Sequence, residues 1–400
     1  MTLRDRFSDV MMPTYGAPPV ALVRGHGCRV TDEDGRDYLD LIGGIAVSAL
    51  GHGHPALVRA VSEQVATLAH TSNLFVNEPS VRLAEKLLHL LAASGPGRVF
   101  FTNSGTEATE AGVKLALKAG NGNRVRFVAA TGAFHGRSLG ALSLTAKAAY
   151  REPFGPPALD VVRVPYDDPQ ALASAVDETT AAVVIEPTQG EAGVVPGPDA
   201  LLDTARRACD RSGALLIIDE VQSGIGRTGA WFAHQGAGVR PDVLLLAKGL
   251  GGGLPIGACV GFGRWGITLG KGDHGSTFAG NPVAAAAALA VLDTIESAGL
   301  LENARAVGDR LAAGITGLGA PIIAGTTGSG LWRAIVLTEP IAPDIEAAAR
   351  DAGFLLNAVT PDRIRLAPPL ILTAAEADEF LAALPGILQA ATSEAVGSRP

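Results

Sequence analysis

Two short apolar runs in the middle of the chain each end in a side chain that can do chemistry. Ala214–Ile218 is followed by Asp219 and Glu220, and Val243–Ala247 is followed by Lys248. Apolar runs of this length between turn residues are typical of buried parallel strands. Ligands of open α/β sheets bind outside the carboxyl ends of such strands. The pattern therefore predicts a site that holds a carboxylate and an amine, and such a lysine can form a Schiff base with a carbonyl cofactor.

The same two residues also have a structural interpretation, in which Asp219 caps a helix and Lys248 pairs with it. Taken alone, a pair of this kind is more often structural than catalytic. In the catalytic interpretation the carboxylate keeps a pyridinium nitrogen protonated, and the ring becomes an electron sink. Desolvation at the strand end would lower the pKa of the lysine. Gln222, on the loop after Asp219, could hydrogen-bond a ring hydroxyl.

Two polar turns could bind a phosphate group. In the first, a strand pattern passes into a helix pattern at Ser104, Gly105 and Thr106. Free N–H groups at a helix start attract anions, and glycine lets the backbone approach a ligand closely. An ordinary serine N-cap explains these residues equally well. In the second turn, Ser276 and Thr277 precede an Asn-Pro helix start, and the alternative is a plain loop.

Charged and aromatic residues stand at further strand ends. Phe134 offers an aromatic face and Arg137 a fork for a carboxylate, although such residues are usually core and surface, respectively. Glu191 and Arg365 lie at strand-to-loop corners. They could act on a ligand, or form a salt bridge that contributes little if it is exposed.

The elements that position these residues alternate between strand and helix from Arg98 to about Gly280, which predicts an α/β fold with a mostly parallel sheet and helices on both faces. Prolines before residue 20 predict an extended N-terminal arm, followed by a hairpin that turns at Asp34-Gly35. The C-terminal part reads as a smaller α+β domain. We expect an arm and hairpin at 1–45, a large domain at 46–285 and a small domain at 286–400.

Composition narrows the class of protein. The 400 residues carry a net charge of -8 without long charge runs, which argues against nucleic-acid binding. The three cysteines are far apart, so they indicate neither a disulfide framework nor a metal site and fit a reducing compartment. Neither a signal peptide nor a membrane span is predicted. We expect a cytoplasmic enzyme.

Together and in this order, the segments closely resemble the class III, ornithine-type aminotransferases. The resemblance runs from Tyr15-Gly16-Ala17-Pro18 to Arg365-Leu366-Ala367-Pro368-Pro369, and IIDEVQSGIGRTG followed by PDVLLLAKGLGGGLPIGA is its most specific part. It implies the type I fold of the enzymes that use pyridoxal 5′-phosphate (PLP), and a homodimer with shared sites. The resemblance implies that Lys248 forms the internal aldimine, that Asp219 holds the pyridinium and that Gln222 holds the 3-hydroxyl. Phe134 would stack on the ring. The phosphate would be bound by Ser104, Gly105 and Thr106, and Thr277 would reach the phosphate of the partner subunit's cofactor.

Within the family, residues 15–30 and 43–55 look most like acetylornithine aminotransferases, which implies transfer of the δ-amino group of N-acetylornithine to 2-oxoglutarate. Ile45 stands where ornithine aminotransferases carry a bulkier tyrosine, so an open wall would admit an acylated substrate. Tyr15 is a further candidate contact. By the same resemblance Arg137, with the partner subunit's Ser276, would grip acetylornithine, and Arg365 would take the α-carboxylate of glutamate after releasing Glu191.

Other activities fit the same motifs. Ornithine, succinylornithine, succinyldiaminopimelate and 4-aminobutyrate are alternative amino donors. A glutamate-semialdehyde aminomutase would have the same fold, but the Glu191 and Arg365 pair argues against it. A PLP-sensing regulator would need a DNA-binding region ahead of the fold, and the short N-terminal arm leaves no room for one.

Overall fold

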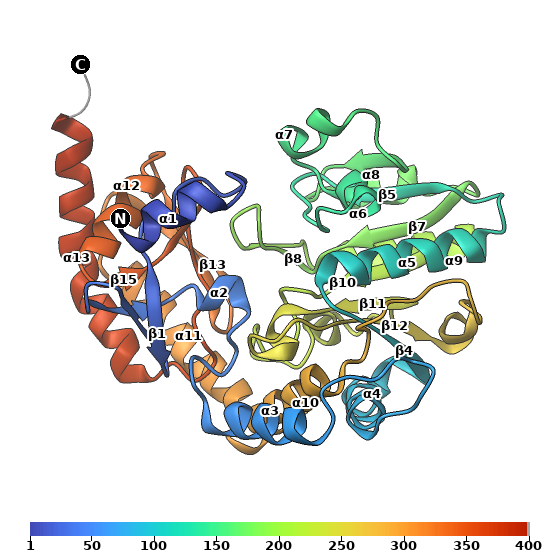
Figure 1. Ribbon diagram of the computed structural model, residues 1–400. Coiled ribbons are helices and arrows are strands. Elements are labelled where there is room, and N and C mark those ends of the chain that lie inside the picture. The colour runs from blue at the N-terminus through green and yellow to red at the C-terminus, as the bar shows by residue number, and fades with distance from the viewer. Residues whose placement is uncertain (398–400) are drawn as a thin grey trace.

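The computed structural model describes residues 1–397 and is built around a seven-stranded sheet (Figure 1). Its strands lie in the spatial order β4 (Gly97–Thr102), β12 (Gly257–Phe262), β11 (Val243–Leu246), β10 (Leu215–Asp219), β7 (Thr180–Ile185), β5 (Arg126–Ala130) and β6 (Asp160–Val164). β12 runs antiparallel to both of its neighbours and the other pairs are parallel. The carboxyl ends of β4, β11, β10, β7 and β5 therefore meet at one edge.

Helices cover both faces of this sheet, which explains the continuous apolar runs of its strands. Leu215 and Ile217 of β10 pack in the same core cluster as side chains of α5 (Gly105–Gly120). Leu216 and Ile218 point to the other face, where α9 (Leu201–Ser212) packs. A strand buried on both faces has no polar side to show in the sequence. The predicted α/β architecture with a mostly parallel sheet is confirmed.

A second group of elements joins the two ends of the chain. One sheet has the order β1 (Leu22–His26), β2 (Arg29–Asp32), β3 (Asp37–Asp40) and β15 (Phe354–Leu355), so that β3 pairs in parallel with a strand from far along the sequence. The other has the order β13 (Ile323–Ser329), β14 (Trp332–Leu337), β17 (Arg363–Leu366) and β16 (Asn357–Thr360). Both lie beside the large sheet in Figure 1. The domain boundaries at residues 45 and 285 stay a prediction.

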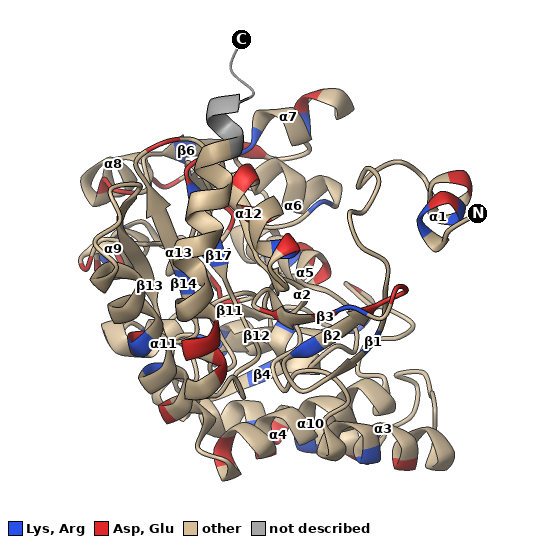
Figure 2. Ribbon diagram, turned by 90° about the vertical axis from the view of Figure 1, so that its left-hand side faces the viewer, with Lys and Arg blue, Asp and Glu red and all other residues tan. Residues whose placement is uncertain are grey.

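The N-terminal arm begins with a helix, which corrects the expectation of an extended segment. α1 (Leu3–Val10) starts at Thr2, whose hydroxyl accepts a hydrogen bond from the Asp5 N–H while the Asp5 carboxylate accepts one from the Thr2 N–H. This capping box stabilises the first turn ahead of the prolines. α1 has no buried residue and projects from the body of the molecule (Figure 2), although the Leu3 N–H donates a hydrogen bond to Glu33 Oε2 at 3.2 Å.

The remaining helices complete the layers around the sheets. Within residues 1–397 no single helix is long and apolar enough to cross a membrane; α10 and α11 pass that test only as a pair, with a 69° bend between them. The other elements are α2 (Gly43–Ala46), α3 (Pro55–Thr67), α4 (Glu78–Leu90), α6 (Leu139–Leu144), α7 (Ala148–Arg151), α8 (Pro169–Ala175), α10 (Pro282–Ser297), α11 (Leu300–Gly317), α12 (Ala342–Asp351), α13 (Ala374–Gly397), the short strands β8 (Thr188–Gln189) and β9 (Val195–Pro196), and 3₁₀ turns at Ala92–Ser94, Glu152–Phe154, Ala233–Ala237, Lys248–Gly251 and Gly263–Ile267.

Candidate active site

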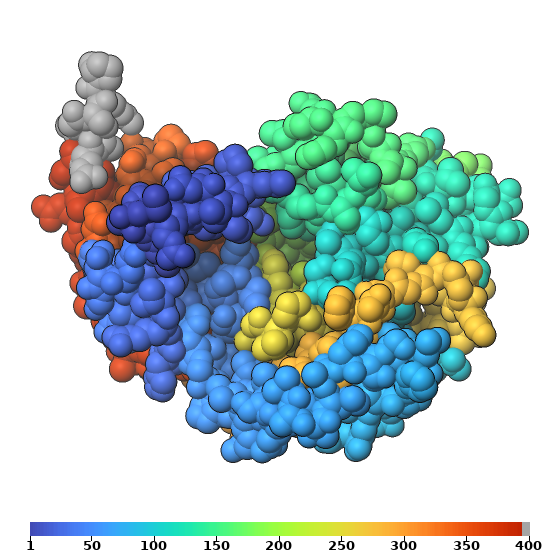
Figure 3. Space-filling model, in the orientation of Figure 1, coloured from blue at the N-terminus to red at the C-terminus, as the bar shows by residue number. Residues whose placement is uncertain are grey.

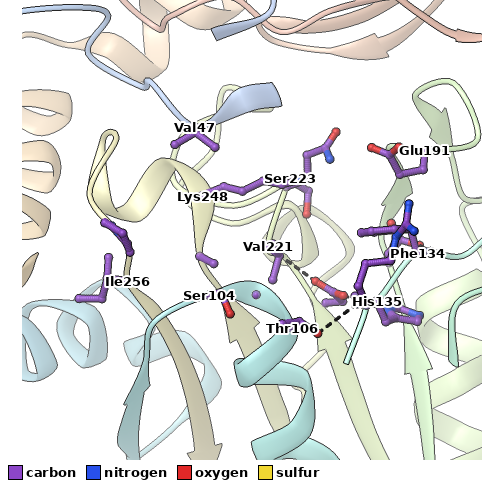
Figure 4. A pocket seen from close by; sticks show the side chains of 18 of the residues that line it. Val47, Ser104, Thr106, Phe134, His135, Glu191, Val221, Ser223, Lys248 and Ile256 are labelled. Carbon is purple, nitrogen blue, oxygen red and sulfur yellow. Dashed lines mark hydrogen bonds and ion pairs between the residues drawn. The ribbon is translucent and has the colours of Figure 1, made fainter. Parts of the chain in front are cut away.

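A cavity of about 450 Å³ lies at the carboxyl edge of the seven-stranded sheet. It opens in the hollow between the N-terminal elements and the large sheet that is visible in Figure 3. Figure 4 shows that its walls come from several elements, with the start of α5 on one side and the loop after β5 on another. Nine residues singled out from the sequence line it: Ser104, Gly105, Thr106, Phe134, Arg137, Glu191, Asp219, Gln222 and Lys248.

Lys248 follows β11 after a single residue, Ala247, and opens a 3₁₀ turn, Lys248–Gly251. Its φ of 46° lies in the left-handed region, which side chains other than glycine rarely adopt. Its side chain extends into the cavity near Ser223 (Figure 4). Burial lowers the pKa of its amine to about 8, although the nearby Glu191 carboxylate acts in the opposite direction. A substantial fraction of this amine is therefore neutral near pH 8.

Asp219 is held by two partners, a backbone N–H and a histidine. Its Oδ1 accepts a hydrogen bond from the Val221 N–H at 2.9 Å, and its Oδ2 lies 2.7 Å from Nδ1 of His135. Burial opposes the charged form of His135, but the hydrogen bond and charge of Asp219 outweigh it and raise the pKa of the histidine. The proposed structural pair with Lys248 is absent among the described hydrogen bonds and ion pairs. Asp219 is instead positioned as a fixed negative charge in the cavity wall.

The start of α5 forms a close-packed turn at the cavity. The Ser104 hydroxyl accepts a hydrogen bond from the Glu107 N–H, so the N-cap interpretation is correct for this residue. Thr106 Oγ1 accepts hydrogen bonds from the N–H groups of Arg137 and Ser138. A Cβ atom on Gly105 would lie 2.7 Å from a methyl carbon of Val221, so only glycine fits here. Being an N-cap does not exclude anion binding, because other N–H groups of the first turn remain free.

Arg365 lies beside the cavity in a closed ion pair. Its Nη1 donates to Glu191 Oε1 at 2.6 Å and to Gln222 Oε1 at 3.1 Å. Its Nη2 donates to Asn357 Oδ1 at 2.7 Å. Burial of Glu191 opposes its ionisation, but the charge of Arg365 more than compensates and the pKa of Glu191 is lowered. The pair expected from the resemblance is therefore present, and one of its partners, Arg365, is almost fully buried.

Arg137 lies on another wall of the cavity and, unlike the buried and ion-paired Arg365, has an exposed side chain. Its guanidinium lies over the ring of Tyr150 at 3.5 Å and near the ring of Phe134 at 5.8 Å. No hydrogen bond or ion pair joins its guanidinium to a carboxylate among the described residues. Stacking on aromatic faces holds the cation in place without neutralising it. Arg137 can therefore receive a carboxylate from outside.

Besides Arg365, which lies beside the cavity, four of the predicted site residues do not line it. Tyr15 is 90% exposed and Ile45 is 43% exposed; Val47 lines the wall instead. Ser276 and Thr277 lie in a surface loop, where Thr277 is exposed. The structure of one chain therefore leaves the roles of these four residues as predictions.

Several lining residues were missed from the sequence. Asn103 precedes the turn at α5, and His135 and Glu186 follow β5 and β7. Glu186 accepts a hydrogen bond from the Phe134 N–H at 3.1 Å, and burial raises its pKa to about 8. Asn357, which holds Arg365, was also missed. Each of these four residues contacts a partner in another segment of the chain, so local sequence patterns do not indicate its role. Its position near the end of a strand was the only signal.

Comparisons with known proteins agree with this arrangement. A family model described as aminotransferase class-III matches residues 10–388. The chain is 56% identical over 390 residues to the acetylornithine aminotransferase of Mycobacterium tuberculosis (strain ATCC 25618 / H37Rv), covering 98% of this chain and 97% of that protein.

Solved structures agree as well. The ornithine aminotransferase from Toxoplasma gondii ME49 superposes with a TM-score of 0.92 at 29% identity, covering 98% of this chain and 95% of that one. An amine transaminase from an uncultivated Pseudomonas species, solved in its PLP-bound form, superposes with a TM-score of 0.86 at 32% identity, covering 96% and 97%.

Proposed function

The chain belongs to the class-III aminotransferases, and we propose that it transfers the δ-amino group of N2-acetyl-L-ornithine to 2-oxoglutarate. The products are N-acetyl-L-glutamate 5-semialdehyde and L-glutamate, a step of arginine biosynthesis. The observation that carries this choice of substrate is the 56% identity over nearly the whole chain to a relative named for that reaction. The two arginines at the cavity support it, because both substrates bring carboxylates.

The cofactor of this proposal is PLP, and the residues present fit it. A buried carboxylate, Asp219, and an amine of lowered pKa, Lys248, line one cavity. The start of α5 offers N–H groups to a phosphate. Val221 is so close to Gly105 that this position has no room for a side chain. Bound PLP would supply an electron sink for the carbon that carries the amino group. Lys248 and Asp219 would hold its carbonyl carbon and ring nitrogen, Gln222 its hydroxyl, and Phe134 its ring face.

We assign the proton transfers to Lys248. A general acid/base works best when its pKa is near the working pH, and burial brings the pKa of this amine to about 8. Asp219 is held in place in the same cavity, because His135 Nδ1 lies 2.7 Å from its Oδ2 and the Val221 N–H donates to its Oδ1. A fixed anion of this kind favours protonation of a ring nitrogen placed against it.

Two differently charged substrates must use one cavity in turn. The exposed Arg137 would bind the carboxylate of acetylornithine, with help from the partner subunit's Ser276. While that substrate is bound, Glu191 would keep Arg365 neutralised, so that no buried cation is left unpaired. Glutamate would displace Glu191 and place its α-carboxylate on Arg365. Ile45 and Tyr15 would line the entrance that the acyl group occupies.

The proposal includes a homodimer. Leu74, Phe75 and Val76 are 86%, 70% and 86% exposed, and Phe278 is 60% exposed. The two segments lie together, because Asn73 Nδ2 donates a hydrogen bond to the Ala279 carbonyl oxygen. Exposed apolar side chains on neighbouring segments are typical of an interaction site. A second copy of the chain is its proposed occupant, because Thr277 beside Phe278 would then reach the partner's cofactor.

Half-reaction spectroscopy tests the choice of substrate. The PLP-loaded enzyme is mixed with acetylornithine, ornithine, 4-aminobutyrate or succinyldiaminopimelate without 2-oxoglutarate, and the loss of its visible absorbance is followed. We expect acetylornithine to give the largest rate divided by apparent dissociation constant. A higher value for any other donor would replace acetylornithine as the substrate, and conversion that needs no amino acceptor would indicate an isomerase.

A further inference from the structure

A surface segment, residues 270–276, lies along α5, and we call it the strap. Near the C-terminal end of the helix Lys118 forms an ion pair with Asp273. One turn earlier, Lys114 Nζ donates to the Asp273 carbonyl oxygen at 2.6 Å and lies 3.1 Å from Nδ1 of His274. The ring of His274 packs at 5.1 Å from that of Phe100 on β4. In Figure 3 the golden segment near residue 270 lies on the surface between α5 and α4.

The strap meets the cavity wall at its other end through Asn103. The side-chain amide of Asn103 donates to Ser276 Oγ at 2.9 Å and to Glu107 Oε2 at 2.8 Å. The Asn103 N–H donates to the same Glu107 oxygen at 2.9 Å, which fixes the orientation of the side chain. Asn103 also lines the cavity directly before Ser104. One side chain therefore joins the proposed phosphate-binding turn to the end of the strap.

Thr277 is the next residue after this contact, and it lies outside the cavity of its own chain. It is exposed and does not line that cavity. Phe278, which follows it, is 60% exposed and contacts the ring of His70. The strap thus carries Thr277 outward into the apolar surface that we assign to a second copy of the chain.

We propose that Asn103 is a positioning residue for the partner subunit's cofactor site, because it holds Ser276 and so fixes the place of Thr277. This proposal rests on the homodimer proposed above. The ion pair and hydrogen bonds at Lys114 and Lys118 hold the far end of the strap, whereas Asn103 makes the side-chain contact at the end next to Thr277. Asn103 thereby borders the phosphate-binding turn of its own chain and also fixes Thr277, the proposed phosphate ligand in the site of the other chain.

Mixed dimers can separate this effect from a local one. One chain carries N103A together with K248A, and the other chain is unmodified; the reference dimer carries K248A alone in the first chain. Because only the unmodified chain keeps Lys248, the visible absorbance of cofactor bound through that lysine reports on its site alone. Titration of the apoenzyme with PLP should show binding about fivefold to tenfold weaker than in the reference, the loss typical of one hydrogen bond.

Two further variants keep the result interpretable. S276A in place of N103A should reproduce the loss, because it removes the other half of the hydrogen bond. N123A, at an exposed position just beyond the far end of α5, should leave the affinity unchanged. Equal affinity in the N103A and reference dimers would overturn the proposal. A monomer in sedimentation would contradict the proposed assembly instead, and unmodified chains that bind no PLP would contradict the proposed function.

Discussion

Two parts of the proposed site differ in how firmly their side chains are held. We call Asp219, Thr106 and Lys248 the floor, and Arg137 with the proposed contacts Tyr15 and Ile45 the rim. On the floor, Asp219 is 5% exposed and has two partners, and Thr106 accepts two backbone hydrogen bonds. On the rim, Arg137 is exposed and, among the described residues, aromatic stacking alone holds its guanidinium. Tyr15 and Ile45, which we propose to complete the rim, are exposed as well. The floor is preorganised for one ligand, whereas the rim leaves room for several.

Arg365 lies between these extremes. It is as buried as Asp219 on the floor, yet its charge is neutralised by Glu191, a residue that a substrate carboxylate would replace in the proposed function. An unpaired buried cation would be strongly destabilising, so the pair protects the cavity between half-reactions. The contrast predicts that floor variants lose all chemistry, that Arg365 variants lose one half-reaction, and that rim variants change only the preference among donors.

The largest effect is expected for Lys248→Ala on the floor. Loss of the amine removes the proposed covalent attachment and the proton carrier together, so turnover should fall by on the order of 10⁴-fold or more. The visible absorbance of lysine-bound cofactor should vanish as well. Steady-state assays and absorbance spectra measure both. Retention of either property would show that the floor does not depend on this residue.

Arg365→Ala should separate the two half-reactions. The glutamate half-reaction should weaken by about 100-fold, because a buried carboxylate loses its charged partner. The acetylornithine half-reaction should change by much less, since Arg365 is paired with Glu191 during that step. Single-turnover rates with each amino donor measure the two losses. Arg137→Ala is the matched control that should weaken acetylornithine, and equal losses from R365A in both half-reactions would refute the two-arginine assignment.

The pH dependence of cofactor capture sharpens the description of the floor. Only the neutral amine of Lys248 attacks a carbonyl, and its pKa is lowered to about 8. The capture rate by apoenzyme should therefore rise with pH through a midpoint near 8, gaining about tenfold between pH 7 and 9. Stopped-flow absorbance measures this rate. A midpoint near the ordinary lysine value, above pH 10, would mean that burial does not tune the amine.

The smallest effect is expected at the rim, for Ile45→Tyr. A larger side chain should narrow the entrance for the acyl group, so kcat/KM for acetylornithine should fall about tenfold or less relative to that for ornithine. Competition between the two donors measures the ratio directly. A change in a floor residue would lower kcat/KM for both donors equally. An equal loss for both donors would therefore contradict the assignment of Ile45 to the rim.

The predictable part of the molecule was the part encoded locally. Apolar runs and the charged residues after them located β10, β11, Asp219 and Lys248, because a fully buried parallel strand has a distinct composition. The α/β architecture followed from the alternation of strands and helices. The pair of Glu191 and Arg365 came from family resemblance, since the two residues are far apart in the chain.

The missed features depend on contacts between distant segments. His135 pairs with Asp219, and Asn103 reaches Ser276, but neither partner is visible from the local sequence. The helix α1 is a different case. Its capping box, Thr2-Leu3-Arg4-Asp5, was present in the sequence, and the downstream prolines were given too much weight.

The pairing of β3 with β15 has a consequence for the order in which the chain is made. Leu39 and Leu41 donate backbone hydrogen bonds to Gly353 and Leu355, more than three hundred residues later. While the ribosome synthesises that intervening chain, roughly 15 to 60 s at usual rates, this edge of the first hairpin has no native neighbour. An uncovered strand edge pairs readily with other chains. Until β15 is made, this edge of the first sheet is therefore open to pairing with other nascent chains.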